Sequence, residues 1–483
     1  MSLYLPMFQL RARDLMEPVR IRLTPETPCE QAVRELAASS AACAVVVDSA
    51  GRTIGTLDSA DIMARAAFRV PGSTPVRAIM SRAVETVSEQ TPLYRAIAEM
   101  QAANCHHAVV IAPDGRPLGL LPVISARVLP ASLARLDKLA PSPTVSALQA
   151  ARSHQQAIVR DLLHAGTPAP EIQRVIACLN DDIHRQALEL ARQSMEADGW
   201  GKPPVPFTLI VTGSAGRMES FLDPDQDNAM VLADYPDRDH GAVDRFFAEL
   251  ASRMSRHLDQ VGVRFCPGHV MARNPLWRKT ISQWRDQMRG WVRRRSQQSF
   301  LFSKILLDCR DVAGERSLGL ELRRSMQEHF TASPSYLRAL VLNESPRTVG
   351  LGWFDRIMTE SDDGAHAGEL DLKRYGIAPL VEAVRLYALA HDVDATTTPQ
   401  RLTALADTGA LTTDAADYLL RTHAFIAGLI FERQNDDATH ERPLGKHITP
   451  DRLTRWQREQ LVSGLKEIQG LVDRLARDLG GER

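Results

Sequence analysis

The sequence has no excess of charge of either sign and no long hydrophobic run. Its 483 residues include 58 Lys+Arg and 59 Asp+Glu, which gives a formal net charge of -1. This balance excludes a generally basic nucleic-acid-binding chain and a polyanionic tail. No run approaches the roughly 20 apolar residues of a membrane helix, and the first residues show no cleavage-site pattern. We therefore expect a cytoplasmic protein that has no membrane partner and is not directed at nucleic acid.

Cysteine and lysine are also scarce. The six cysteines never form a CxxC pair, and no histidine cluster accompanies them. This pattern excludes a disulfide framework and argues against a structural zinc site. Lysine occurs at only seven positions, so arginine carries nearly all the positive charge. With 44% apolar residues the chain is globular, and its length predicts two to four domains of about 100–200 residues each.

The N-terminal region contains an internal repeat. Residues 14–65 align without gaps to residues 78–129 at a constant offset of 64, which places Gly55 on Gly119. Each copy predicts a helix after a Thr-Pro opening, a β-branched strand, a glycine turn, a second short strand and a last helix. Because one copy is too small to bury its own sheet face, we expect the two copies to pack against each other.

The repeat resembles a tandem pair of CBS domains, here at 11–70 and 74–131. The resemblance implies a regulatory module that binds an adenine nucleotide between its halves and forms a homodimer. In the first copy Gly55, Asp58 and Asp61 fall on the family's ligand motif. Asp61 fits the ribose position, but Asp58 stands where a hydroxyl is expected and would repel a phosphate. The second copy lacks both polar positions, so nucleotide binding and a structural, dimerising role both stay open.

A helical connector is expected over residues 132–200, where apolar residues recur at helical spacing. Asp181, Asp182 and His184 in this stretch have the composition of a metal-ligand cluster, but a solvated or helix-packing face is the favoured interpretation. The proline-rich residues 201–206 end the helices and lead into a strand.

The string FTLIVTGSAGRMESFLDPDQDNAMVL, residues 207–232, carries the clearest chemical signal. Its first residues predict a strand, and the small residues GSAGR that follow predict a turn into a helix. Such a turn exposes backbone N–H groups to an anion. Ser214 adds a hydroxyl donor, and Arg217 can make a charge-assisted fork to phosphate. We therefore expect Gly213, Ser214, Gly216 and Arg217 to bind the phosphates of a nucleotide.

Two carboxylates follow this turn. Asp225 and Asp227 flank Gln226 directly before the apolar residues AMVL. As alternate residues of a strand they would point to one face, toward the groove where Ser214 presents phosphate. Adjacent carboxylates facing a phosphate repel each other unless a divalent cation lies between them, and Mg²⁺ or Mn²⁺ holds a triphosphate in this way. Asp225 and Asp227 are therefore expected to be metal ligands and catalytic residues.

The order of strand, GS turn, DxD and apolar strand resembles the DNA polymerase β-type nucleotidyltransferase superfamily. The fuller string G-S-x-G-R-x-E…D-x-D-Q-D-N-A is similar to a nucleotidyltransferase family found beside CBS pairs in bacterial signal-transduction proteins, relatives of the uridylyltransferase that modifies the PII protein. CPGHVMARNPLW at 266–277 and LLDCRDVAG at 306–314 also match. The resemblance covers about residues 145–330, with the nucleotidyltransferase-like domain at 201–330. It implies transfer of a nucleoside monophosphate to an acceptor, by analogy a protein.

Members of this superfamily often place a third carboxylate on a later strand. The best strand candidate, VGVRFCPGHVMAR, contains none. Asp308 is the well-placed later acid, and two roles stay open for it: a catalytic residue of the site, or the partner of a neighbouring arginine. In the second case a metal would be bound weakly and activity would be low or absent.

The stretch from Trp277 to Arg295 mixes tryptophans with arginines. Such a mixture can form a platform for stacking nucleic-acid bases. The tryptophans recur every seven residues, however, with Ile281 and Met288 between them, so a buried stripe on one helix is the favoured interpretation. The arginines would then be free to meet an acidic protein partner.

Residues 335–483 predict an all-helical C-terminal domain, similar to the one that accompanies the same nucleotidyltransferase family. Its scattered histidines, including His391, His423, His440 and His447, are expected to be ordinary surface or core residues. The predicted fold is therefore a multidomain α+β/α chain: a tandem CBS pair, a polymerase β-type domain with a helical N-terminal connector, and a helical C-terminal domain.

Two functions fit these signals. The leading hypothesis is a regulated nucleotidyltransferase that uses Mg²⁺ or Mn²⁺ and a nucleoside triphosphate (NTP), acts on a protein acceptor in signal transduction, and forms homodimers through its CBS domains. The alternative is a non-catalytic signalling adaptor, in which the CBS pair and a degenerate nucleotidyltransferase fold bind nucleotide or protein partners.

Overall fold

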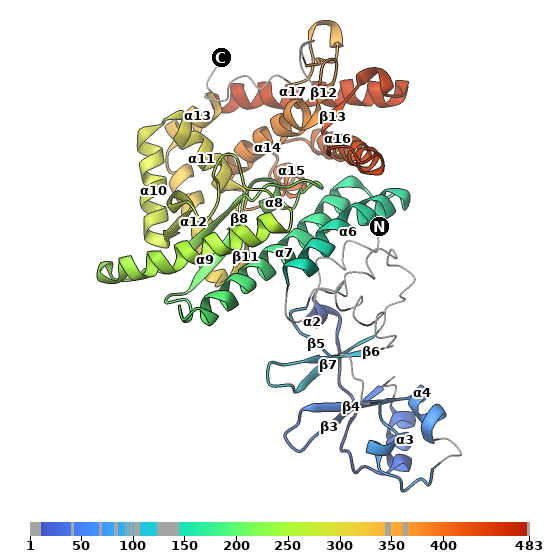
Figure 1. Ribbon diagram of the computed structural model, residues 1–483. Helices are drawn as coiled ribbons and strands as arrows, with labels where there is room; N and C mark the ends of the chain where they lie inside the picture. Colours follow the sequence, from blue (N-terminus) through green and yellow to red (C-terminus); the bar gives the residue numbers. More distant parts are fainter. Residues whose placement is uncertain are drawn as a thin grey trace. The chain divides into compact units, whose positions relative to one another are not determined.

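A computed structural model describes residues 11–39, 43–66, 70–81, 86–91, 93, 96, 100, 107–122, 144–342, 349–360 and 366–480. The contacts divide the chain into two compact units, Met1–Ala140 and Pro141–Arg483 (Figure 1). The expectations for the end of the second repeat at 123–131 and for the start of the connector at 132–143 lie outside the described residues.

In the first unit, the strand pairing repeats in the same way as the sequence. β3 (Cys43–Val47) pairs antiparallel with β4 (Thr53–Asp58), and β6 (His107–Ile111) pairs antiparallel with β7 (Pro117–Pro122). The registers differ by the sequence offset: Cys43 faces Asp58 and His107 faces Pro122. The two copies therefore have the same strand geometry as well as similar sequences.

The same offset relates the strands that flank each hairpin. β2 (Arg22–Leu23) runs parallel to β3, and β5 (Thr86–Ser88) runs parallel to β6. β1 (Glu17–Pro18) pairs with β7, so a segment near the start of the first copy completes the sheet of the second. A shared apolar cluster joins the copies, and its buried members are Cys43, Val45, Val109 and Leu120. The expected packing of one copy on the other is therefore present.

The helices described in the first unit are short. They are α2 (Ala12–Leu15), α3 (Cys29–Ala38), α4 (Ser59–Asp61) and the helical turns Ile62–Ala66 and Val76–Ala78.

The second unit is built on a four-stranded sheet in the order β10-β9-β8-β11. Its strands are β8 (Phe207–Val211), β9 (Asn228–Leu232), β10 (Arg278–Thr280) and β11 (Arg310–Gly314). β8 runs antiparallel to both β9 and β11, whereas β10 runs parallel to β9. β9 is buried along its whole length, which explains why apolar residues follow its first residue, Asn228, without interruption.

Helices cover this sheet, and the first two of them come from the stretch expected to be a connector. They are α6 (Val145–His164), α7 (Ala169–Ala197), α9 (His240–Gln260), α10 (Ile281–Arg294), α11 (Gln297–Leu307) and α12 (Arg316–Thr331). α7 lies alongside α9, as Figure 1 shows, and α12 packs on β8, β9 and β11. Residues 144–200 thus belong to the core of the second unit and do not link two separate bodies.

The cluster expected in α7 serves helix packing. Asp181 accepts two hydrogen bonds from the Arg310 guanidinium, at 2.8 and 2.9 Å, and thereby ties α7 to β11. Asp182 pairs with Arg185 on the same helix, and His184 Nδ1 lies 2.8 Å from the Asn180 carbonyl oxygen.

The tryptophan stripe is buried but is not a single helix. Trp277, Trp284 and Trp291 are 1%, 0% and 6% exposed. Trp277 lies in the turn Pro275–Trp277, and β10 separates it from α10. Thr280 caps α10 in a reciprocal pair with Gln283, so the helix begins only at Ile281.

The C-terminal half of the second unit, from residue 334 onward, is mostly helical and packs on the rest of that unit. Its elements are α13 (Pro334–Leu342), α14 (Ala378–Ala390), α15 (Thr398–Asp407), α16 (Thr413–Thr439), α17 (Arg455–Gly480) and the short strands β12 (Leu370–Asp371) and β13 (His447–Ile448). α14 lies against α15 and α17, and α16 reaches α6 and α7. Helical turns at Trp353–Asp355, Lys373–Ile377 and Pro450–Arg452 connect these elements. Within the described ranges, no helix has the length and apolar content that crossing a membrane requires.

Candidate functional site

The GS turn lies directly against the carboxylate pair. β8 ends beside the start of β9, with Val211 facing Asn228. The Thr212 amide donates to the Asp227 carbonyl oxygen (3.0 Å), which extends the pairing by one step. Gly213 has φ +60°, and a Cβ placed on it would lie 3.3 Å from Asp227 Oδ2. The absence of a side chain at Gly213 therefore lets the carboxylate of Asp227 approach the turn.

The two carboxylates precede β9 and are not part of it, which corrects the expected placement on a strand. Asp225 forms an isolated parallel bridge with Arg264, and the Asp227 amide donates to the Asp225 carbonyl oxygen (3.0 Å). Between them Gln226 is buried, and its Nε2 donates to the carbonyl oxygens of Ser255 (3.0 Å) and Val263 (2.8 Å). The side chain of Gln226 is thus anchored in the core, apart from the two acids that flank it.

The electrostatics of this pair are unbalanced. Burial is the main cause that raises the pKa of Asp227, and the nearby charge of Asp225 raises it further. A hydrogen bond from Cys266 and the charges of Lys373 and Arg217 act in the opposite direction without cancelling the effect. No ion pair reaches either carboxylate from any residue that the structure describes.

This environment fits a hard divalent cation. Mg²⁺ is held in proteins by one or two carboxylates, with substrate phosphates and water completing the octahedron. Asp225 and Asp227 would hold the ion, which would offset their mutual repulsion and neutralise charge on a bound triphosphate.

The stretch that was the best strand candidate for a third carboxylate, and contains none, supplies a thiol. Cys266, in CPGHVMARNPLW, is buried and hydrogen-bonds to Asp227. Burial and the charge of Asp227 raise the pKa of the Cys266 thiol to about 11. The protonated thiol donates to the carboxylate, and as a soft group it is a poor Mg²⁺ ligand.

Two lysines missed at the sequence level complete the electrostatics. Lys373 lies in the turn Lys373–Ile377, and burial together with the charges of Lys446 and Arg217 lowers its pKa to about 8, against the opposing influence of Asp227 and Asp225. The Leu372 amide donates to the Lys446 carbonyl oxygen (3.0 Å), so the two lysine-bearing segments are joined. Both come from the C-terminal half, and the scarcity of lysine was the one sequence signal that could have singled them out.

Ser214 and Gly216 have different roles in the turn. Ser214 is half-buried, and its carbonyl oxygen accepts from the Glu219 amide (2.8 Å). A Cβ on Gly216 would lie 1.7 Å from the Asp308 carbonyl oxygen. Gly216 thus permits a close backbone approach within the core, which is a packing role.

Arg217 points into an ion-pair cluster. Its Nε donates to Glu219 Oε2 (2.7 Å) and its Nη1 to Asp308 Oδ2 (2.6 Å). Asp308 also accepts from Arg385 Nη2 (2.5 Å) and Arg401 Nη1 (2.7 Å). Burial alone would raise the pKa of Asp308, but the charges of Arg385, Arg217 and Arg401 outweigh it and hold that pKa well below its usual range.

This cluster bears on the roles expected for Asp308 and Arg217. Both carboxylate oxygens of Asp308 are occupied by guanidinium groups, so the arrangement favours its role as an arginine partner over a catalytic one. Arg217 is 8% exposed and already bonded to two acids, so it has little freedom to grip a phosphate. Its charge still acts on Asp227 and Lys373 at longer range.

The CBS ligand residues are engaged in local structure. Asp58 caps α4 by accepting from the Asp61 amide (2.8 Å), while the Asp61 carboxylate faces the Asp58 amide (3.4 Å). Burial and the charge of Asp58 raise the pKa of Asp61. A Cβ on Gly55 would lie 2.5 Å from Met80 Sδ, so this glycine also permits close packing. The acid at the expected phosphate position is therefore fixed by a helix cap.

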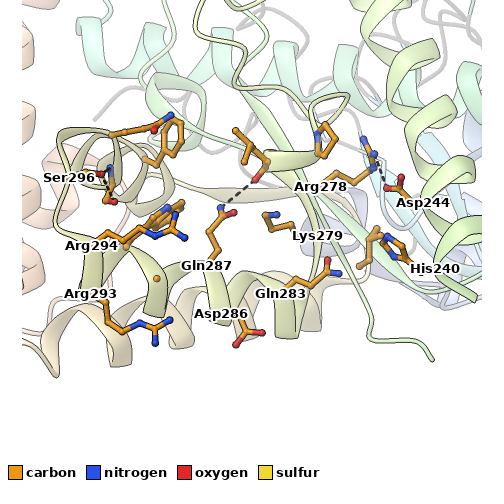
Figure 2. Close-up of a pocket in the computed structure, with 18 of the residues that line it drawn as sticks. His240, Asp244, Arg278, Lys279, Gln283, Asp286, Gln287, Arg293, Arg294 and Ser296 are labelled. Atoms are coloured by element: carbon orange, nitrogen blue, oxygen red, sulfur yellow. Dashed lines mark hydrogen bonds and ion pairs between the residues drawn. The ribbon is translucent and has the colours of Figure 1, made fainter. Parts of the chain in front are cut away.

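A cavity of about 650 Å³ lies elsewhere, beside β10 and α10 (Figure 2). Its charged lining is mostly basic: Arg278, which pairs with Asp244 at 2.9 Å, together with Lys279, Arg293 and Arg294. Burial and the charge of Arg278 lower the pKa of Lys279. The cavity includes the last residue of β9, whereas the carboxylate pair precedes the first, so it is a separate feature.

Three family comparisons cover most of the chain. Residues 12–67 and 76–124 match the CBS domain family. Residues 153–298 match a family described as "Putative nucleotidyltransferase DUF294", and residues 334–479 match one described as "Putative nucleotidyltransferase substrate binding domain". The predicted fold class is confirmed: an N-terminal CBS pair, a nucleotidyltransferase-like α/β domain and a mostly helical C-terminal domain.

Individual relatives cover less of the chain. An uncharacterized protein of Methanocaldococcus jannaschii is 26% identical over 232 residues, which are 47% of this chain and 50% of the relative. The chain thus spans about half the length of this curated relative. A CBS domain protein of Pyrobaculum aerophilum complexed with AMP is 24% identical and covers 25% of this chain and 90% of its own, with a TM-score of 0.23. An uncharacterized conserved protein from Pyrococcus horikoshii is 22% identical and covers 24% and 88%, with a TM-score of 0.23.

Proposed function

We propose that the protein transfers a nucleoside monophosphate from an NTP to a protein acceptor in a divalent-cation-dependent reaction. The observation that carries this proposal is the approach of Gly213 to Asp227, beside a second carboxylate, with no ion pair at either acid among the described residues. A dead site has no physical need to keep two mutually repelling acids beside a phosphate-binding turn.

Each residue has a definite part in the proposed reaction. The backbone N–H groups of the Gly213 turn and the hydroxyl of Ser214 bind the triphosphate. Lys373 and Lys446 add positive charge from the C-terminal half. Asp225 and Asp227 would hold Mg²⁺ or Mn²⁺, which would neutralise charge at the α-phosphate.

The transfer itself is a displacement at phosphorus. An acceptor hydroxyl oxygen forms a bond to the α-phosphorus, the bond to the bridging oxygen of the β-phosphate breaks, and pyrophosphate leaves. The hydroxyl proton passes to solvent or to a carboxylate of the site. No oxidant or further reactant is needed.

The basic cavity beside α10 offers a docking surface for the acceptor. Arg293 and Arg294 line it and form no ion pair with any described residue. An acidic segment of a protein acceptor would complement this charge. In this proposal the cavity selects the acceptor while the carboxylate pair carries out the transfer.

The CBS pair is proposed to regulate the transfer as part of a homodimer. An adenine nucleotide is the proposed effector, with its ribose bound by Asp61. Because Asp58 occupies the phosphate position, we expect adenosine to bind the pair better than AMP. Equilibrium dialysis with both compounds tests this order, and tighter binding of AMP would contradict it.

Label transfer tests the catalytic proposal. The purified full-length protein is incubated with each α-³²P-labelled NTP, Mg²⁺ or Mn²⁺ and a lysate of the source organism. We expect a labelled protein band from wild type and none from Asp225→Asn/Asp227→Asn. An Arg293→Glu/Arg294→Glu variant should lose acceptor labelling while keeping NTP affinity.

Three outcomes are informative in different ways. No label with any NTP, from protein shown to be folded, would favour the adaptor, which the thiol at Cys266 in place of a third carboxylate also supports. Equal labelling by the carboxylate variant would mean that another site does the chemistry. Equal labelling by the arginine variant would move acceptor docking away from the cavity.

A further inference from the structure

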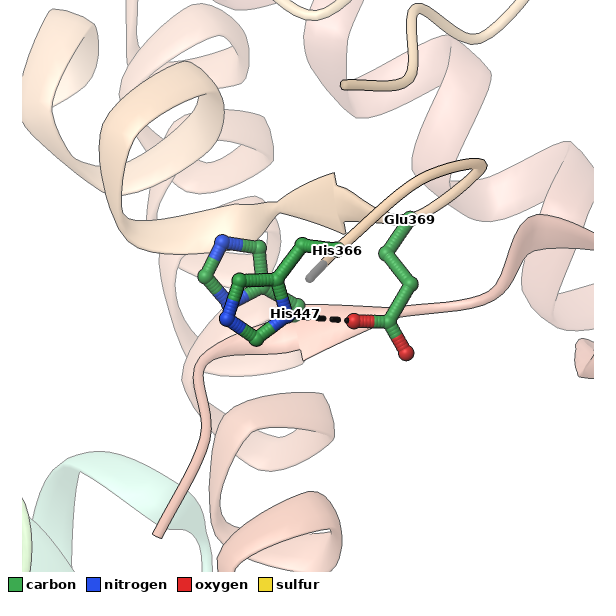
Figure 3. Close-up of side chains that lie close together, drawn as sticks. All are labelled: His366, Glu369 and His447. Atoms are coloured by element: carbon green, nitrogen blue, oxygen red, sulfur yellow. Dashed lines mark hydrogen bonds and ion pairs between the residues drawn. The ribbon is translucent and has the colours of Figure 1, made fainter. Parts of the chain in front are cut away.

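Three potential metal ligands meet at the small sheet of the C-terminal half. His366 and Glu369 lie just before β12, and His447 is the first residue of β13. Asp371 faces His447 in the β12–β13 register, which brings the two segments together although they are far apart in the sequence. Figure 3 shows the two imidazole rings beside the glutamate. This cluster shares no residue with the Asp225/Asp227 site.

The donor atoms already converge. His366 Nδ1 lies 2.8 Å from Glu369 Oε2, and the rings of His366 and His447 are stacked with their centroids 3.7 Å apart and their planes at 6°. One ligand atom from each of the three residues lies within 4.8 Å of the others. In the parts of the chain that the structure describes, no other group of three such residues meets this criterion.

The surroundings supply partners for the three ligands. Asp371 Oδ2 lies 3.8 Å from His447 Nε2, close enough to orient that ring or to act as a fourth ligand. Arg433 Nη1 lies 3.7 Å from Glu369 Oε1 and is held by Asp437, 3.0 Å from its Nε. The arginine leaves Oε2, the oxygen nearest His366, as the available atom of the glutamate.

We propose that His366, Glu369 and His447 bind a divalent transition metal, with Zn²⁺ as the reference ion. Two imidazoles and one carboxylate are a ligand set that suits Zn²⁺, and they leave a position for Asp371 or water. In a tetrahedral site with metal–ligand bonds of about 2.0–2.1 Å, donor atoms lie about 3.3 Å apart. The His366–Glu369 contact therefore opens slightly, and the more exposed His366 ring turns out of the stack.

A neighbouring pair provides the matched comparison. His440 also pairs with a carboxylate, 3.2 Å from its Nδ1 to Asp436 Oδ1, and its side chain is exposed to a similar degree, 57% against 48% for His366. It differs in lacking a second imidazole. A His–carboxylate pair alone is an ordinary surface feature, so the stacked second ring distinguishes the proposed site.

Zn²⁺ titration by calorimetry tests the proposal in the Asp225→Asn/Asp227→Asn background, which removes the other carboxylate pair. We expect one Zn²⁺ per chain, affinity at least tenfold weaker in His366→Ala and His447→Ala, and no change in His440→Ala. Glu369→Gln should weaken binding less, because it keeps an oxygen donor. Hydrogen exchange of residues 366–371 and 446–448 should slow when Zn²⁺ is added.

Two results would overturn this assignment. One is that the background protein binds no Zn²⁺; the other is that it binds Zn²⁺ equally well in the His366→Ala and His447→Ala variants. Because the readouts are heat and exchange in a protein with its transfer site removed, they stand or fall independently of nucleotidyl transfer.

Discussion

The second unit contains two groups of acidic residues in opposite electrostatic states. Asp308 is 1% exposed, yet three arginines satisfy it and hold its pKa low. Asp227 lies beside another carboxylate and forms no ion pair with any residue that the structure describes, and its pKa is raised. The same side chain is thus stabilised in one place and left with unbalanced charge in the other.

The difference separates structure from chemistry within one motif. Gly213 faces Asp227, whose charge is unbalanced, whereas Arg217 and Glu219 join the satisfied cluster. A string of residues that looks like a single nucleotide-binding signature therefore divides into an end that offers a site and an end that holds the domain together. Substitutions at the two ends should have different consequences.

Removing the satisfied acid should have the largest effect on stability. Asp308→Asn leaves three buried guanidinium groups around a neutral amide, and breaking a buried ion pair in this way costs about 3–5 kcal/mol of the free energy of unfolding. Urea denaturation measures the loss. The control is Asp286→Asn, which removes an exposed pair with Arg289 and should change stability by less than about 0.5 kcal/mol. A loss at Asp308 as small as this control's would contradict the comparison.

Removing Asp227, the acid with unbalanced charge, should not lower stability. Because the folded-state pKa of Asp227 is raised, ionisation of this group opposes folding as pH rises above its unfolded value. Asp227→Asn should therefore leave stability at pH 7 unchanged or higher. It should also weaken Mg²⁺-dependent NTP binding at least tenfold, about 1.4 kcal/mol. Fluorescence anisotropy of a labelled NTP measures this, and retained affinity would disprove the assignment.

The lysine at the site should make binding depend on pH. Lys373 has a pKa of about 8, so it is charged below that value and loses its charge as pH rises. We expect NTP affinity in Mg²⁺ to fall several-fold between pH 7 and 9. Lys373→Arg should flatten this fall because arginine stays charged, whereas Lys373→Met should bind weakly throughout. A fall that is identical in all three proteins would assign it to another group.

The smallest effect is expected when a third carboxylate is added beside Asp227. Cys266→Asp places an acid beside Asp227, so repulsion should lower the melting temperature without metal, and Mg²⁺ should restore it more than in wild type. Differential scanning calorimetry with and without Mg²⁺ measures the two shifts. Cys266→Ser is the control for loss of the thiol alone. An identical Mg²⁺ effect in wild type and Cys266→Asp would show that residue 266 does not face the ion.

Local patterns predicted local features well. The offset of 64 anticipated paired registers in both CBS copies. The GS turn and the carboxylate pair were expected together because the turn follows one strand of the motif and the pair comes at the next strand. The start of α10 was predicted wrongly, with Trp277 placed on the helix, although Thr280 and Gln283 are spaced as a capping box that marks its beginning. The side-chain direction of Gln226, which keeps Asp225 and Asp227 out of β9, depends on its distant partners Ser255 and Val263.

Long-range ion pairs could not be predicted in this way. Helical periodicity identifies which residues of α14 and α15 face inward, but it does not reveal that Arg385 and Arg401 meet Asp308. Lys373, Lys446 and His447 lie in a single helical turn, a loop and a two-residue strand, which are too short to show any periodicity. Their convergence follows from how the C-terminal half packs, which the sequence pattern of each segment does not contain.

The arginine cluster around Asp308 also limits how regions of this chain can be exchanged during evolution. Arg217 comes from the region matched as a nucleotidyltransferase, and Arg385 and Arg401 come from the region matched as substrate binding. Exchange of either region by recombination would leave buried charge without its partners unless the new segment brought matching residues. The two regions are therefore expected to be inherited together, and gene fusions that keep only one of them should be poorly tolerated.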